Sequence, residues 1–230
     1  MKTIYKTFIP ELVNLEAERR FFEICGFGRD RNKFQRMIDE ALAIKESIQD
    51  IVRIRVAYSK VELFNLDESK LTMGGVSFQS NAFQYLDGKE VSAIYPFVMT
   101  SGEYDLENRS IMEMFYMDTW GTAYVESGRK AMKDEIQKNN PGKYVLDSFG
   151  PGFLGMPLED VGQFFKMLDC RWAGIDWHEN GIMTPLKSLA GFFVVMNTEP
   201  KLDFSDCRSC IGNTAGCKFC KAGLKKSDMA

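Results

Sequence analysis

Four cysteines close to the C-terminus have the spacing of metal ligands. They form the pattern C-x2-C-x6-C-x2-C, and they are Cys207, Cys210, Cys217 and Cys220. Each two-residue spacer lets both of its thiolates face the same point, so the two pairs can hold one tetrahedral or cubane metal centre. The pattern predicts that residues 201–230 form a small metal-binding tail.

The spacing alone leaves the identity of that metal open. Zinc ribbons usually place more than six residues between their cysteine pairs. A [4Fe–4S] cluster is usually held by a C-x2-C-x2-C run, which this tail lacks. Two disulfides would also use four cysteines, but they are disfavoured in a reducing compartment. An iron–sulfur cluster and zinc therefore both remain as interpretations.

A glycine-rich loop at residues 147–157 is the second candidate site. Gly150, Gly152 and Gly155 allow the backbone to approach a ligand closely or to turn at positive φ. The helix predicted to follow would also point free N–H groups toward the loop. The letters fit G-x-G-x-x-G, but two prolines remove N–H donors that a pyrophosphate needs, which argues against a dinucleotide site. The segment is interpreted as a connecting loop or a ligand-binding loop.

Together with the segment from Trp172 to Met196, this loop resembles the activation domain of cobalamin-dependent methionine synthase, and in particular its short free-standing relatives. The shared pattern is P-G-F-x-G-x-P-L, an amphipathic helix, and then G-I-x-x-x-E-N-x-I-M-x-P-x-K-S-x-A-G-F-F. The resemblance covers residues 10–196, with a weaker D-x-x-G-x-A-x-x-E match that contains Asp118 and Glu126. It implies a ligand site formed by these two carboxylates and by a set of downstream residues. The downstream residues are Ser148, Gly150, Gly152, Phe153, Glu179, Met183, Pro185, Ser188 and Gly191.

The resemblance also implies a fold and a role. The fold is a C-shaped α+β domain with a bent, largely antiparallel sheet and flanking helices. The role is that of an accessory protein for corrinoid-dependent methyl transfer, which presents S-adenosylmethionine or delivers an electron to cob(II)alamin in a partner. The expected partner is a corrinoid-binding protein or methyltransferase. Because reductive activation needs an electron, this role ranks iron–sulfur slightly above zinc. Whether the chain is itself an enzyme stays open, and the alternative function is a zinc-containing interaction module.

Two departures from the family pattern bear on the ligand. The family arginine falls on Ser148, and the family tyrosine falls on Phe153. A guanidinium fork suits the carboxylate of S-adenosylmethionine, and neither residue replaces it. We therefore expect weak binding of S-adenosylmethionine, unless another residue supplies the charge, the ligand binds only in the corrinoid complex, or a different methyl donor is used.

Composition and charge argue against a nucleic-acid-binding or membrane-spanning protein. The chain has 230 residues, of which 45% are hydrophobic and 27% charged, with a net charge of −3. Residues 201–230 carry +3 and residues 1–200 carry −6, so nucleic acid is not expected as a partner. The longest apolar run, Leu189 to Met196, has eight residues, far fewer than the ~20 needed to cross a membrane. We expect a cytoplasmic protein with a domain at residues 1–200 and the tail at 201–230.

Hydrophobic periodicity predicts the elements that position these residues. Helices are expected at 11–25, 30–49, 107–139 and 158–168, three or four strands between 51 and 99, and two strands around 174–183 and 188–196. Strands that cluster in this way favour an α+β fold with an antiparallel sheet. Cys25 and Cys170 are expected in the core. His178, the single histidine, is interpreted as structural, with an approach to the partner's corrinoid as the minor alternative.

The tail is predicted to be separable from the domain. We expect Cys210→Ser to lose the metal while circular dichroism of the domain stays nearly unchanged, because all four ligands lie within the tail. Brown colour with broad visible absorption indicates iron–sulfur, whereas a colourless protein with stoichiometric zinc indicates zinc. Global unfolding of this variant would contradict the prediction.

Overall fold

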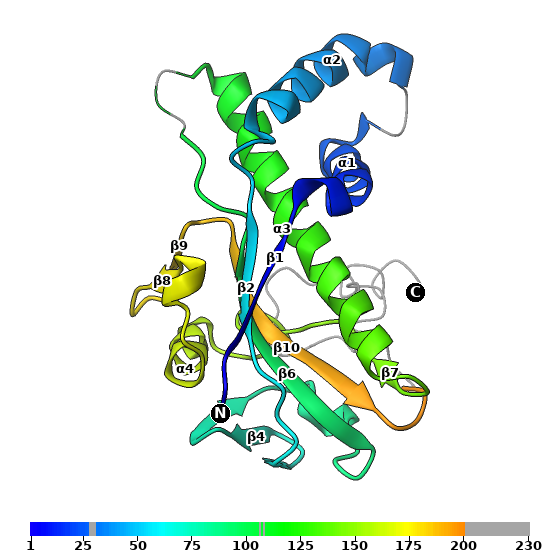
Figure 1. Ribbon diagram of the computed structural model, residues 1–230, viewed down its shortest axis with the longest axis vertical. Coiled ribbons are helices and arrows are strands. Elements are labelled where there is room, and N and C mark those ends of the chain that lie inside the picture. Colours follow the sequence, from blue (N-terminus) through cyan, green and yellow to red (C-terminus); the bar gives the residue numbers. More distant parts are fainter. Residues whose placement is uncertain (28–30, 106, 108, 201–230) are drawn as a thin grey trace, which may run out of the picture.

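A five-stranded antiparallel sheet is the centre of the fold (Figure 1). The computed structural model describes residues 1–27, 31–105, 107 and 109–200. The strand order is β1-β2-β6-β10-β7. The bounds are β1 (Ile4–Phe8), β2 (Ile54–Tyr58), β6 (Val91–Thr100), β7 (Tyr144–Val145) and β10 (Ser188–Met196). The prediction of an α+β fold with an antiparallel sheet is confirmed, and the four-cysteine tail lies outside the described residues.

Three helices lie on one side of this sheet, with α3 against the strands and α1 and α2 packed against α3. They are α1 (Pro10–Cys25), α2 (Arg31–Ile48) and α3 (Ile111–Asn139), and Figure 1 shows the long α3 crossing the sheet. A capping box starts α3, because the Ser110 hydroxyl accepts from the N–H of Glu113 while the Glu113 carboxylate accepts from the N–H of Ser110. Between α1 and α3, Trp120 of α3 stacks on Phe21 of α1 with ring centroids 3.9 Å apart. This contact lies in the larger hydrophobic core.

The opposite face carries smaller elements and a second core. A three-stranded sheet contains β3 (Phe64–Leu66), β4 (Lys70–Met73) and β5 (Val76–Gln79). Around it lie the short helices η2 (Phe83–Tyr85), η3 (Leu158–Asp160), α4 (Val161–Met167) and η4 (Arg171–Ala173), and the hairpin of β8 (Asp176–Trp177) and β9 (Met183–Thr184). The rings of Phe78, Phe164 and Phe192 pack against one another in this core.

The predicted elements differ from the observed ones at their ends. The helix expected at 107–139 begins at Ile111, because Ser110 caps it. The helix expected at 158–168 is a 3-10 turn followed by the seven-residue α4. Neither β1 nor β7 was predicted. Cys170 is buried and Cys25 half-buried against the larger core, as expected, and burial raises the pKa of their thiols to about 12 and about 11.

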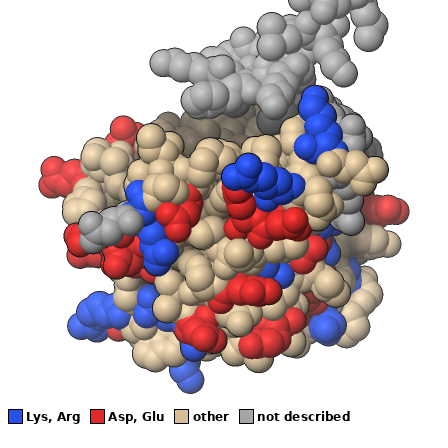
Figure 2. Space-filling model, turned by 90° about the horizontal axis from the view of Figure 1, so that it is seen from above, with Lys and Arg blue, Asp and Glu red and all other residues tan. Residues whose placement is uncertain are grey.

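The surface is of mixed charge on the face shown in Figure 2. Lys and Arg side chains alternate there with Asp and Glu side chains. Ion pairs form within α1, where Arg19 pairs with Glu16 and Glu23, and within α2, where Arg36 pairs with Glu40. Among the described residues, no helix combines the length and the apolar character that a membrane span requires.

The contact between α3 and the sheet depends on a glycine. A Cβ at Gly128 would overlap Ile54 Cγ2 and lie 3.2 Å from Met99 Sδ, and both neighbours are buried. We expect Gly128→Ala to lower the free energy of unfolding by about 1–3 kcal/mol through overpacking, although alanine normally stabilises a helix by about 1 kcal/mol relative to glycine. Urea denaturation measures the effect.

The control is the double variant Gly128→Ala/Ile54→Ala. Ile54→Ala removes Cγ2, the atom that the new Cβ would overlap, together with the rest of the side chain beyond Cβ. The double variant should therefore lose less stability than the sum of the single changes. Additive losses would contradict the overpacking explanation.

Candidate functional site

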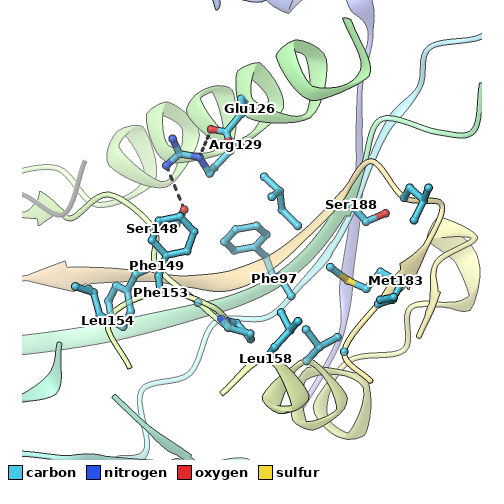
Figure 3. A pocket seen from close by; sticks show the side chains of 18 of the residues that line it. Phe97, Glu126, Arg129, Ser148, Phe149, Phe153, Leu154, Leu158, Met183 and Ser188 are labelled. Atoms are coloured by element: carbon cyan, nitrogen blue, oxygen red, sulfur yellow. Dashed lines mark hydrogen bonds and ion pairs between the residues drawn. The ribbon is translucent and has the colours of Figure 1, made fainter. Parts of the chain in front are cut away.

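A cavity of about 640 Å³ lies where α1 and α3 face the glycine-rich loop and the start of β10. Figure 3 shows it from close by, with Glu126, Arg129 and Ser148 at one end and Met183 and Ser188 at the other. Its walls combine residues that are far apart in the sequence, because β6, α3, the loop and β10 meet here.

The cavity occupies an open stretch of sheet edge. β7 pairs with β10 only at Val195 and Met196, and Phe149 forms an isolated bridge with Phe192. In an antiparallel ladder, backbone groups of every second residue point to the same edge. The N–H and C=O groups of Ala190 therefore point to the same side as those of Phe192, toward Gly150 of the loop, and both Ala190 and Gly150 line the cavity.

The glycine-rich loop is fixed against β10 and against the three-stranded sheet. A Cβ at Gly150 would overlap the Ala190 carbonyl oxygen and lie 2.8 Å from Gly191 Cα. Further on, Leu154 adopts a φ of 50°, which is unusual for a residue of this size. Its carbonyl oxygen accepts hydrogen bonds from Ser80 Oγ at 3.0 Å and from Asn81 N at 2.8 Å. The corner after β5, residues 80–82, thus holds the loop in a backbone conformation that is unfavourable without these hydrogen bonds.

A half-buried arginine forms the charged end of the cavity. Arg129 Nε donates to Glu126 Oε2 at 2.9 Å, and its Nη1 donates to Asp147 Oδ1 and, at 3.3 Å, to Ser148 Oγ. Lys133 Nζ lies 3.8 Å from Asp147 Oδ2. Burial of Arg129 opposes its charge, but Glu126 and Asp147 outweigh this effect, so the pKa of the guanidinium is raised. Among the described residues, Nη2 of Arg129 forms no hydrogen bond.

The rest of the cavity is mainly apolar. Phe97, Leu154 and Leu189 are among its buried or partly buried wall residues. At the mouth, several large apolar side chains are exposed although they line the same cavity. These are Ile24, Phe153, Leu158, Ile182 and Leu186. The site therefore suits a ligand with one charged end and an apolar or aromatic body.

The structure brings about half of the predicted site residues to this cavity. Glu126, Ser148, Gly150, Phe153, Met183 and Ser188 line it. Gly152, Pro185 and Gly191 belong to the same segments but not to the lining. Gly152 is a turn residue with a φ of 85°, Pro185 accepts a hydrogen bond from Ser188 Oγ at 2.6 Å, and Gly191 packs on the Phe149 backbone.

Asp118 and Glu179 are also outside the lining. Asp118 shares a face of α3 with Glu126, as expected, but its carboxylate pairs with Lys187 Nζ at 2.7 Å. Glu179 is exposed in the turn of the β8–β9 hairpin. Next to it, His178 Nε2 lies 3.3 Å from Thr184 Oγ1 within the same hairpin, in line with a structural role.

Sequence reasoning missed Arg129, although a signal was present. Residues three apart on a helix are neighbours, so Arg129 lies on the same face of α3 as Glu126. Its position beside Ser148 depends on the tertiary structure. The guanidinium that the loop lacks at residue 148 is therefore present in the cavity on another element.

The described residues contain no group of three or more His, Cys, Asp or Glu side chains arranged to hold a metal ion. The predicted ligands Cys207, Cys210, Cys217 and Cys220 lie outside the described part of the chain. The metal-binding tail thus stays a prediction.

Comparison with known proteins identifies a structural relative. No family model matches the chain, and no curated protein matches it in sequence. Among solved structures, the chain is similar to the MetH reactivation domain bound to AdoHcy, with a TM-score of 0.64 and 11% sequence identity. The match covers 86% of this chain and 80% of that chain. The chain shares this fold, a curled antiparallel sheet with flanking helices.

The close approach of the loop to β10 can be tested at Gly150. We expect Gly150→Ala to lower the free energy of unfolding by about 1–3 kcal/mol, because the new Cβ meets backbone atoms of β10 that cannot rotate away. Chemical denaturation measures the loss. Pro151→Ala is the matched control, since Pro151 lines the same cavity. Equal stability of the Gly150→Ala variant and the unmodified chain would contradict the close approach.

Proposed function

We propose that this chain is an accessory protein for corrinoid-dependent methyl transfer and that it binds an S-adenosyl ligand in the cavity. The observation that carries the proposal is a cavity with charges of both signs at one end and apolar walls elsewhere, on the fold of a domain solved with AdoHcy. Its volume of about 640 Å³ is within the roughly 300–1,000 Å³ of small-molecule sites.

The charged end suits the amino-acid part of such a ligand. Arg129 Nη2 is available for a carboxylate, while Glu126 and Asp147 offer carboxylate oxygens to an ammonium group. A half-buried guanidinium binds a carboxylate more strongly than an exposed one, since less water competes for it. In this proposal Arg129 supplies the charge that Ser148 lacks, which is one of the three explanations left open by the sequence.

The apolar walls suit the adenosyl part. Phe97 and Leu189 would exclude water from one side of it, and Phe153 would cover it at the mouth. Phe153 replaces the tyrosine of the family pattern, so it offers the same ring without a hydroxyl group. These residues orient the ligand with its charged end at α3.

The partner in this proposal is a corrinoid-binding protein or methyltransferase. Cobalamin held by that partner would supply the centre that exchanges the methyl group. The exposed apolar side chains at the mouth, such as Ile182 and Leu186, suit burial against a protein surface. The four thiolates of the tail would hold an iron–sulfur cluster or zinc.

Calorimetric titration with AdoHcy tests the ligand and the role of Arg129. We expect the unmodified chain to bind, and Arg129→Met to bind about tenfold to a hundredfold more weakly, because a hydrogen bond to a charged group contributes roughly 1.5–3 kcal/mol. Lys133→Met is the matched control: Lys133 pairs with the same Asp147 but does not line the cavity.

Two results would count against this assignment. No heat of binding to the unmodified chain would remove the S-adenosyl ligand from the cavity. Equal affinity of the Arg129→Met variant and the unmodified chain would keep the ligand but remove Arg129 as its carboxylate partner.

A further inference from the structure

Arg55, outside the cavity, is an arginine whose charge the fold leaves uncompensated. It lies on β2 with an intermediate exposure, and its Nε is buried without a hydrogen-bond partner. Among the described residues, neither Nη1 nor Nη2 forms an ion pair or a hydrogen bond. Burying part of a guanidinium without partners costs free energy of desolvation, so the fold gains nothing from this charge in the unbound chain.

Two polar groups near Arg55 are engaged elsewhere. Its neighbour on β6 is Thr100, whose hydroxyl donates to the Lys187 carbonyl at 3.1 Å and accepts from Gly102 N at 3.1 Å. Arg171, on η4, forms a bidentate ion pair with Asp169, in which the Nε–Oδ1 distance is 2.8 Å and the Nη2–Oδ2 distance is 2.7 Å. The described residues thus provide a carboxylate for the exposed Arg171 but none for the more enclosed Arg55.

The guanidinium of Arg55 lies against the backbone at the end of η4. It packs on Gly174, where a Cβ would lie 3.1 Å from Nη1 and 3.4 Å from Nη2. Nε is buried, whereas Nη1 and Nη2 are not among the buried unpartnered atoms of the described residues, so the Nη1–Nη2 edge is the side of the fork left for a ligand. Two donors on one rigid edge match two oxygens of a carboxylate or phosphate group.

The surroundings of Arg55 resemble a recognition surface. On the same face of the sheet, Tyr5 of β1 contacts Trp172 of η4, with ring centroids 5.2 Å apart. Both rings are exposed, Tyr5 by 37% and Trp172 by 51%. Arginine, tyrosine and tryptophan are the residues enriched at the hot spots of protein–protein interfaces.

We propose that Arg55 is an oxyanion-binding residue, which takes a carboxylate or phosphate group on the Nη1–Nη2 edge with Gly174 beneath it and the Tyr5–Trp172 pair beside it. The site is separate from the cavity. In the sheet register Arg55 is opposite Thr100, and Thr100 is opposite Ser188, so two strand spacings, about 10 Å, separate Arg55 from the cavity wall. The proposal does not depend on the function proposed for the cavity.

Nuclear magnetic resonance titration of the full chain tests the site with two probes at constant ionic strength, inorganic phosphate and hexaglutamate. The backbone amide of Gly174 reports on the guanidinium that packs against it. We expect a saturable shift with at least one probe in the unmodified chain, at least tenfold weaker binding in Arg55→Lys, which keeps the charge but loses the fork, and no saturable shift in Arg55→Met. Arg53→Met is the matched control, because Arg53 is exposed and precedes the same strand.

The probes separate the two sources of the oxyanion. Saturation with phosphate alone indicates a phosphate-bearing ligand, and saturation with hexaglutamate indicates an acidic protein segment. Both outcomes support the site. No response to either probe, or equal responses of Arg55→Met and the unmodified chain, would overturn it.

Thermal unfolding gives a second readout. Because Arg55 has no hydrogen-bond or ion-pair partner in the described part of the chain, we expect Arg55→Met to melt at or above the temperature of the unmodified chain in chloride buffer. Clear destabilisation of both Arg55→Met and Arg55→Lys would show a structural role and overturn the proposal.

Discussion

The antiparallel pairing of β6 with β10 is the contact on which both hydrophobic cores depend. Alternate residues of the two strands point to opposite faces, so Phe97 and Phe193 enter the core under the helices while Val98 and Phe192 enter the other core. A shift by one residue would exchange these two sets. The same register places Ser188 opposite Thr100, and thereby sets where β10 begins and where the cavity opens.

The charged end of the cavity is a consequence of how α3 lies on this sheet. Gly128 brings the helix close to Ile54 and Met99, and Arg129, the next residue, is carried to the cavity wall. Two carboxylates then offset the desolvation of its guanidinium. The network of Arg129, Glu126 and Asp147 is the polar part of an otherwise apolar cavity. In small-molecule sites, a few polar groups of this kind fix the orientation of the ligand.

The sequence was informative where a local pattern determines the structure. Hydrophobic periodicity predicted α1 and α2, although Leu12 and Leu15 of α1 are exposed and the buried face of that helix contains Val13, Ala17 and Phe21 instead. The motif match placed the glycine-rich loop and the segment at Met183 in one predicted ligand site. β1 escaped prediction because only one of its five residues, Phe8, is buried. The position of Arg129 beside Asp147 and Ser148 was not predicted, because this position depends on the packing of α3 against the loop. Arg55 gave no signal, since a missing partner is visible only in three dimensions.

The left-handed conformation of Leu154 depends on two parts of the chain that are far apart in the sequence. Its carbonyl needs both Ser80 and Asn81, which belong to the corner after β5 rather than to the loop. A loop transplanted from a relative with a different corner would lose these two donors and relax toward ordinary backbone angles, which would alter the cavity mouth. Chimeras of this fold should therefore exchange residues 80–82 and 149–157 as one unit.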